Sequence, residues 1–163
     1  MGSRDDLAQL HALIRSEPDV AEGLDDYCVL VAEAETFGTW SDAPPRRGEP
    51  FAHDGSEHEF CLLEEGAVLL YTPLSDTPHV VVGADLREFL ALLLLGNGAE
   101  IGGLGYEHGR NETISRLRQG PDPDGDLTDL ERQTLARLRE SFALVPWPDP
   151  GARLDELAAL LPR

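Results

Sequence analysis

The part of the chain that most restricts its possible folds is residues 50–98, where three short apolar runs precede one apolar helix. The runs cover residues 57–63, 67–71 and 79–82, and glycine or proline follows each of them within three residues. Apolar runs of this length, bounded by turn residues, predict β-strands. After residue 83 the apolar spacing changes to the i, i+3, i+4, i+7 pattern of an amphipathic helix. This stretch therefore predicts a β-meander with a helix packed on its face.

Length and the remaining apolar periodicity predict one α+β domain over residues 1–163. A chain of 163 residues falls within the size of one domain and is long enough to bury a core. The predicted sheet is mainly antiparallel and spans about residues 50–82, with residues 50–54 as a short edge strand. Flanking helices are predicted at about residues 5–16, 84–95, 128–142 and 152–161, with a shorter one at residues 112–118. Ser3 is the expected cap of the first helix.

Two segments allow two interpretations each. Residues 24–37 fit a helix, and their first half also fits a buried strand; the length and the Ala-Glu-Ala-Glu tail favour a helix. Residues 120–131 imitate a calcium-binding loop, but Gly120 stands where the first acidic ligand is required. Thr128 and Glu131 also match a capping box, which we favour over a calcium site.

The charge of the chain restricts its partners. It carries 31 acidic and 13 basic residues, for a formal net charge of −18, and every basic residue is an arginine. Such a surface repels nucleic acid and anionic membranes and attracts basic proteins; alternatively, it only keeps the protein in solution. The absence of lysine excludes Schiff-base chemistry and the lysine of a phosphate-binding loop. Cys28 and Cys61 lie in apolar runs, which predicts buried free thiols.

The segments that would direct the chain to a membrane are not recognisable in the sequence. There is no run of eighteen apolar residues, and the acidic first residues lack the apolar region of a signal peptide. We therefore expect a cytoplasmic protein with neither a membrane nor a nucleic acid as its partner.

The predicted partner-binding residues are acids near the first strand of the meander. Strict alternation in residues 57–63 places Glu57 and Glu59 on one side of that strand and His58 on the other. The turns at the two ends of the strand add further carboxylates. The candidate set is Asp54, Glu57, Glu59, Glu64 and Glu65. If the interface is apolar instead, Trp40 and Trp147 are the candidates.

The alternative class is a small metal-binding protein or enzyme that uses His53 and His58. These imidazoles and the nearby carboxylates are ligand types that zinc accepts. The strand alternation, however, points His58 away from Glu57 and Glu59, and the Asp-Gly-Ser turn requires polar groups for its own hydrogen bonds. The sequence also lacks the motif of a catalytic nucleophile. We therefore predict no catalytic residue, no metal and no cofactor.

Residues 50–95 resemble the SUKH superfamily, which includes yeast cell-wall-assembly regulators and bacterial immunity proteins. The similarity lies in Phe-Ala-His-Asp-Gly at 51–55, in the strands at 59–63 and 68–70, and in Val-Val-Val-Gly-Ala-Asp-Leu-Arg-Glu-Phe-Leu at 80–90. Residues 142–149 are similar to a segment of actinobacterial members. The resemblance implies an α+β fold and a non-catalytic role in binding a protein, such as a basic toxin. A housekeeping scaffold without a toxin partner is the third expectation.

Overall fold

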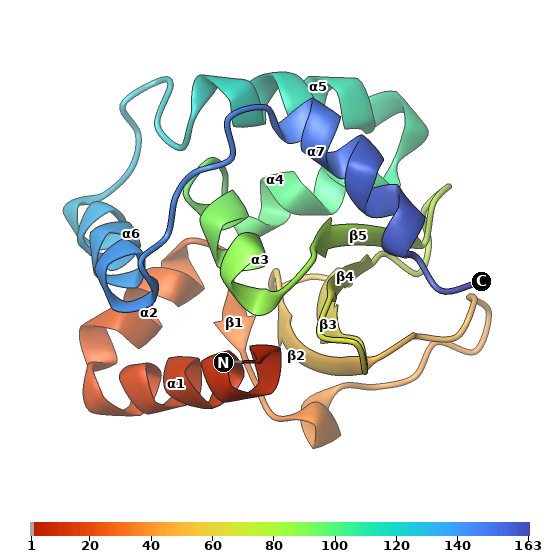
Figure 1. The fold of residues 1–163 in the computed structure, drawn as a ribbon, viewed down its shortest axis with the longest axis horizontal. Coiled ribbons are helices and arrows are strands. Elements are labelled where there is room, and N and C mark those ends of the chain that lie inside the picture. The colour runs from red at the N-terminus through yellow and green to blue at the C-terminus, as the bar shows by residue number, and fades with distance from the viewer. Residues whose placement is uncertain (1) are drawn as a thin grey trace.

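The computed structural model describes residues 2–163 and has the predicted α+β fold, with helices packed around one antiparallel sheet (Figure 1). The strands are β1 (Leu30–Val31), β2 (Glu49–His53), β3 (Glu59–Leu62), β4 (Val68–Tyr71) and β5 (His79–Gly83). The helices are α1 (Ser3–Ser16), α2 (Pro18–Asp26), α3 (Leu86–Leu93), α4 (Gly98–Gly102), α5 (Glu107–Gln119), α6 (Asp129–Phe142) and α7 (Pro150–Leu157). Short 3₁₀ helices lie at Ala34–Thr36, Gly103–Gly105 and Ala158–Leu160.

The sheet is a meander in which sequence neighbours pair antiparallel, in the order β1-β2-β3-β4-β5. Gly55 and Gly66 adopt φ angles of 88° and 97° in the turns before and after β3, a conformation that glycine enters without steric cost. The predicted edge strand at residues 50–54 corresponds to β2, but it is not an edge because β1 pairs with its outer side. Pro50 is tolerated in β2 because the register shifts between Pro50 and Ala52.

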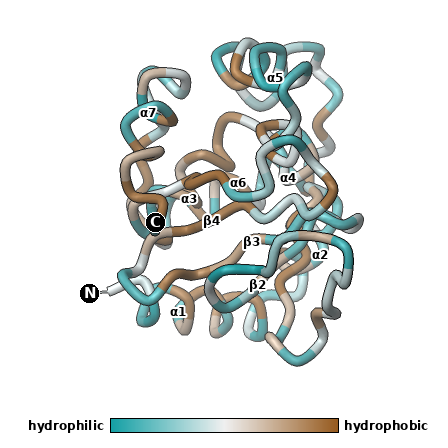
Figure 2. The backbone as a smooth tube through the Cα atoms, turned by 90° about the vertical axis from the view of Figure 1, so that its right-hand side faces the viewer, coloured by the Kyte–Doolittle hydropathy of each residue, from teal (hydrophilic) through white to brown (hydrophobic). Residues whose placement is uncertain are grey.

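The inner face of the sheet is covered by α3, as the apolar periodicity predicts. Phe89 is fully buried, and the centroid of its ring lies 4.8 Å from that of Phe60 in β3. The helix begins where the Asp85 side chain accepts a hydrogen bond from the Glu88 N–H. In Figure 2, α3 and the central strands form an apolar middle of the molecule, whereas α5 is largely hydrophilic.

The favoured helix at residues 24–37 is wrong, because α2 begins earlier and ends at Asp26. The end has the hydrogen bonds of a Schellman motif: Val29 N–H donates to Leu24 O, Cys28 N–H donates to Asp25 O, and Cys28 has a left-handed φ of 57°. Tyr27 fixes this end to α3, since its hydroxyl donates to the Leu93 carbonyl over 2.9 Å. The chain then continues as β1.

The first helix starts at Ser3, but Ser3 is not its cap. Gly2 occupies the cap position, and the Ser3 hydroxyl instead donates to the Gly66 carbonyl and accepts from the Leu86 N–H. Asp6 is buried and forms an ion pair with Arg87, at an O–N distance of 2.9 Å. These contacts join α1 to the β3–β4 turn and to the start of α3.

The C-terminal half agrees with the predicted helices at residues 128–142 and 152–161 to within a few residues. Thr128 and Glu131 form the predicted capping box at the start of α6. The helix predicted at residues 112–118 is part of the longer α5, and α4 was not predicted. None of the helices in residues 2–163 is both long and apolar enough to cross a membrane.

Candidate functional site

The β2–β3 turn holds the residues that the sequence suggests both for partner binding and for metal binding. Asp54 shapes this turn, because its Oδ1 accepts hydrogen bonds from the Ser56 N–H (2.9 Å) and from the Ser56 hydroxyl (2.7 Å). The Asp54 N–H donates to the His58 carbonyl and so closes the turn around Gly55. The Asp-Gly-Ser sequence therefore forms its own polar turn, as expected.

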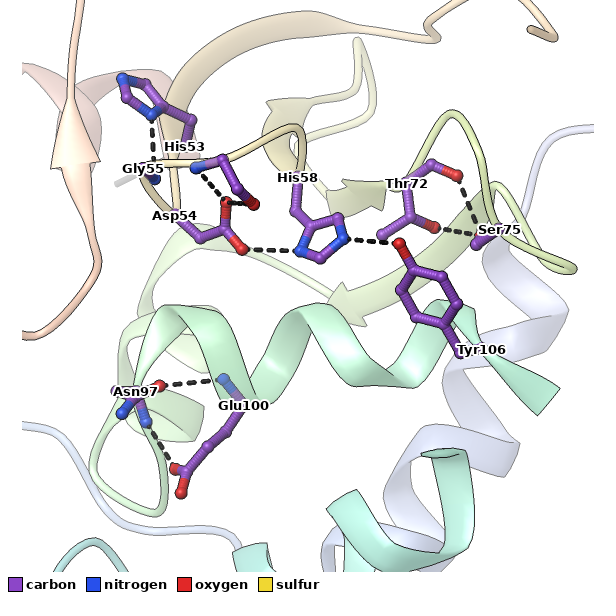
Figure 3. A network of polar contacts seen from close by, with 10 residues as sticks. His53, Asp54, Gly55, His58, Thr72, Ser75, Asn97, Glu100 and Tyr106 are labelled. Carbon is purple, nitrogen blue, oxygen red and sulfur yellow. Dashed lines mark hydrogen bonds and ion pairs between the residues drawn. The ribbon is translucent and has the colours of Figure 1, made fainter. Parts of the chain in front are cut away.

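A chain of hydrogen bonds leads from this turn to the start of α5 (Figure 3). Asp54 Oδ2 lies 2.6 Å from His58 Nδ1, and His58 Nε2 lies 2.9 Å from the Tyr106 hydroxyl oxygen. Burial alone would raise the pKa of Asp54, but the hydrogen bonds from His58 and Ser56 outweigh it, so that its pKa lies below the ordinary value. The carboxylate of Asp54 thus stays charged at neutral pH.

His58 is enclosed by the protein on its α4 side. A Cβ atom added to Gly102 would lie 2.3 Å from His58 Nδ1, so the imidazole rests directly on the backbone of α4. Both ring nitrogens are engaged, one by Asp54 and the other by Tyr106. With both nitrogens engaged in this way, His58 has no nitrogen free to bind a metal. The arrangement therefore serves to tie the β2–β3 turn to the α4–α5 region.

Glu59 is buried on the opposite face of the sheet in an ion pair with Arg46. The Arg46 guanidinium binds both carboxylate oxygens, with an Nη2–Oε1 distance of 2.9 Å, and the hydrogen bond to Glu59 raises the pKa of Arg46. Two further hydrogen bonds hold the same loop: the Tyr71 hydroxyl donates to the Pro44 carbonyl, and His79 Nε2 bonds to the Pro45 carbonyl. Residues 37–48 form a loop that is thereby held against the outer face of the sheet.

The five predicted partner-binding acids do not form one surface. Asp54 and Glu59 are buried and engaged within the fold, whereas Glu64 and Glu65 are exposed at the opposite end of β3. Glu57 precedes the first residue of β3, so strand alternation does not extend to it. It lies near Tyr106, whose pKa is raised mainly by burial and further by Glu57, and not beside Glu59.

The two candidate metal ligands also diverge. His53 Nδ1 accepts a hydrogen bond from the Gly55 N–H, and its ring packs edge-on against Phe37 on the outer face of the sheet. His58 lies on the inner face. Within residues 2–163 there is no group of three or more histidine, cysteine or acidic side chains placed to hold a metal ion.

Of the two tryptophans, only Trp40 lies in an open position. It is 36% exposed and lines a cavity of about 320 Å³ with Phe37 and His53. Trp147 is buried, and its indole N–H donates to the Glu88 carbonyl over 3.0 Å. Trp147 is therefore part of the core and not an exposed anchor for a partner.

The largest concentration of unpaired acids lies in a part of the chain that the sequence reasoning missed. Residues 16–45 contain no arginine, and within residues 2–163 only Glu17 of their eight acids forms an ion pair, to Arg137 of α6. The other seven are Asp19, Glu22, Asp25, Asp26, Glu33, Glu35 and Asp42. The missing arginines are the sequence signal that would have identified this acidic segment.

The acidic segment is not explained by the stability of α2. Asp25 and Asp26 occupy the last turn of that helix, where the negative end of the helix dipole disfavours carboxylates.

Comparisons with protein-family models, with curated proteins and with solved structures find no match for this chain.

Proposed function

We propose that this protein is non-catalytic and neutralises a basic protein partner by direct contact, as immunity proteins of the SUKH superfamily do. The observation that carries the proposal is the acidic segment, residues 16–45, whose carboxylates lie on α2 and on the segment after it. The negative electrostatic field of these carboxylates attracts a cationic protein surface and accelerates the association of the two proteins. Many toxins that act on nucleic acids present a surface of this kind.

The pairing of the remaining charges supports the same role. Most arginines are already bound by acids elsewhere in the fold, for example Arg87 by Asp6, Arg137 by Glu17 and Arg153 by Glu88. The surplus of negative charge is thus left over after the internal ion pairs have formed. The half-buried Glu57 and the exposed Glu64 and Glu65 extend this surplus beyond the acidic segment, and their part in binding stays a prediction.

The separate positions of His53 and His58 support the proposed role over the alternative in which the two residues form one metal or catalytic site. Both nitrogens of His58 have partners, and His53 lies on the other face of the sheet. The Asp54–His58–Tyr106 contacts contribute to the fold of the binding protein. We place its action in the cytoplasm, where a toxin that degrades nucleic acid has its target.

The test is a growth-rescue experiment combined with a binding measurement. We expect a toxin gene beside the gene of this protein, and we expect co-expression of the two to restore growth. Binding of the purified pair should weaken steeply between about 50 mM and about 500 mM NaCl, since salt screens exposed charges. A neighbouring toxin that neither binds this protein nor is inhibited by it contradicts the proposal.

A further inference from the structure

A groove of about 390 Å³ runs along β1, between this strand and the helices α1 and α2. Apolar side chains form much of its lining, among them Ile14, Leu24, Leu30 and Val31, and the carboxylates of Glu22 and Asp25 border it. Both acids are exposed. The groove thus combines an apolar surface with a negative border.

The strand beside this groove is the open edge of the sheet. The opposite edge, β5, is packed against α7 and the last 3₁₀ helix, whereas β1 packs against α2 and pairs with no strand other than β2. Val31 lies opposite Ala52, and the next residue, Ala32, donates its N–H to Phe51 O over 2.9 Å. In an antiparallel ladder this arrangement points the N–H and C=O of Val31 away from β2. These two groups are free to pair with another strand.

The charge around the groove defines which strand it would accept. Glu22 and Asp25 belong to the acidic segment, in which no arginine compensates them. Carboxylates beside an open strand edge repel acidic chains and favour arginine or lysine side chains. A second strand would present alternate side chains to the groove, so that apolar residues face Ile14 and Val31 while basic residues reach the carboxylates.

We infer that this groove binds an extended basic segment of a protein partner, which adds a strand to β1 and places arginine or lysine side chains against Glu22 and Asp25. The inference rests on the proposed function for the basic character of the partner, and it adds the place and the mode of contact.

A synthetic octapeptide of alternating arginine and valine, added to the full-length protein labelled for NMR, tests this binding mode. We expect chemical-shift changes concentrated on residues 21–32. The same peptide, N-methylated at alternate residues so that one edge cannot donate hydrogen bonds, should bind at least about tenfold more weakly. This comparison leaves the protein unchanged, so it does not depend on the folding of a variant. Equal affinity for the two peptides overturns the inference.

Protein variants locate the contact. Val31→Pro removes the outward N–H and leaves the bonds of its neighbours to β2 in place, so it should weaken peptide binding without unfolding the sheet. Glu22→Gln combined with Asp25→Asn should lower the affinity about tenfold, since exposed ion pairs are individually weak. The matched control, Glu112→Gln with Asp126→Asn, removes two exposed charges elsewhere and should have little effect. If the control loses as much affinity for the peptide, the peptide is attracted only by the overall charge of the protein. That result would overturn the inference that the groove is the binding site.

The two proposals fail separately. If the toxin binds and the groove variants bind it as tightly as the wild-type protein, the groove inference is wrong and the proposed function stands. If no toxin binds but the peptide occupies β1, the groove is a strand-binding site and the proposed function is wrong.

Discussion

Asp54 and Glu59 lie five residues apart, yet the fold removes them from solvent on opposite faces of the sheet. Asp54 is held by Ser56 and His58, and Glu59 by Arg46. A buried carboxylate is tolerated only when such partners compensate for the lost hydration. Both residues therefore contribute to stability in ways that exposed acids such as Glu64 do not.

Replacing Asp54 tests the first of these contributions. Asp54→Asn should lower the free energy of unfolding at pH 7 by about 1–3 kcal/mol, because charge-assisted hydrogen bonds are lost from a buried site. The folded-state pKa of Asp54 is depressed, so its stabilisation is present above the unfolded-state pKa and disappears as the pH falls through the folded-state value. The difference in the free energy of unfolding between the two proteins, measured by urea titration, should therefore begin to shrink below about pH 4. A difference in the free energy of unfolding that does not change with pH would show that the Asp54 carboxylate is not the source of this stabilisation.

The Arg46–Glu59 pair allows a comparison of two variants. Arg46→Ala leaves the Glu59 carboxylate, whose side chain is 7% exposed, without its partner and should cost about 3–5 kcal/mol. The double change Arg46→Ala and Glu59→Leu should recover much of this loss, since it removes the unpaired charge. Denaturation midpoints of both proteins provide the measurement. Equal destabilisation of the single and double variants would show that packing of residues 37–48, and not the charge, is responsible.

At the scale of elements, α3 is the helix on which the sheet depends most directly. Its Phe89 ring contacts both Phe60 and Phe51, at centroid distances of 4.8 and 5.9 Å. Phe89→Ala should lower the free energy of unfolding by about 3–5 kcal/mol, because the site is fully buried and leaves a cavity. Leu160→Ala is the control, since Leu160 is 47% exposed and should change stability little. Equal effects of the two substitutions would mean that α3 is misplaced.

The ends of α2 and α6 both place a residue other than glycine in the left-handed region. Cys28 has a φ of 57° and Ala143 a φ of 51°. Such a residue costs about 1–2 kcal/mol, part of which glycine recovers after its greater freedom in the unfolded chain is subtracted. Ala143→Gly should therefore raise the free energy of unfolding by up to about 1 kcal/mol, measured by thermal denaturation. Ser141→Gly, inside α6, should instead destabilise the protein.

At the scale of the whole molecule, the net charge of −18 opposes the compact state, because the surplus carboxylates repel one another. Added NaCl screens this repulsion, so the midpoint of thermal unfolding should rise between about 10 mM and about 300 mM salt. The same salt should weaken binding to a basic partner. A midpoint that does not respond to NaCl would mean that the ion pairs of the surface offset the repulsion.

The elements that depend on near neighbours could be predicted from the sequence. The pattern of apolar residues predicts the strands β4 and β5 and the helix α3. The capping box of α6 follows from two side chains three residues apart. Of the candidate acids, Asp54, Glu64 and Glu65 lie in the β2–β3 and β3–β4 turns, as expected. Residues within a few positions of each other fix such features, and the remainder of the chain changes them little.

Where α2 ends and what the polar residues contact depend on packing between segments that are far apart in the sequence. Tyr27 anchors the end of α2 through a hydrogen bond to the Leu93 carbonyl, and Tyr106 bonds to His58, which lies 48 residues away in the sequence. The pairing of β1 with β2 leaves one edge open beside α2. Whether a carboxylate is buried or exposed depends on which distant segment packs over it, and local periodicity carries no information about that segment.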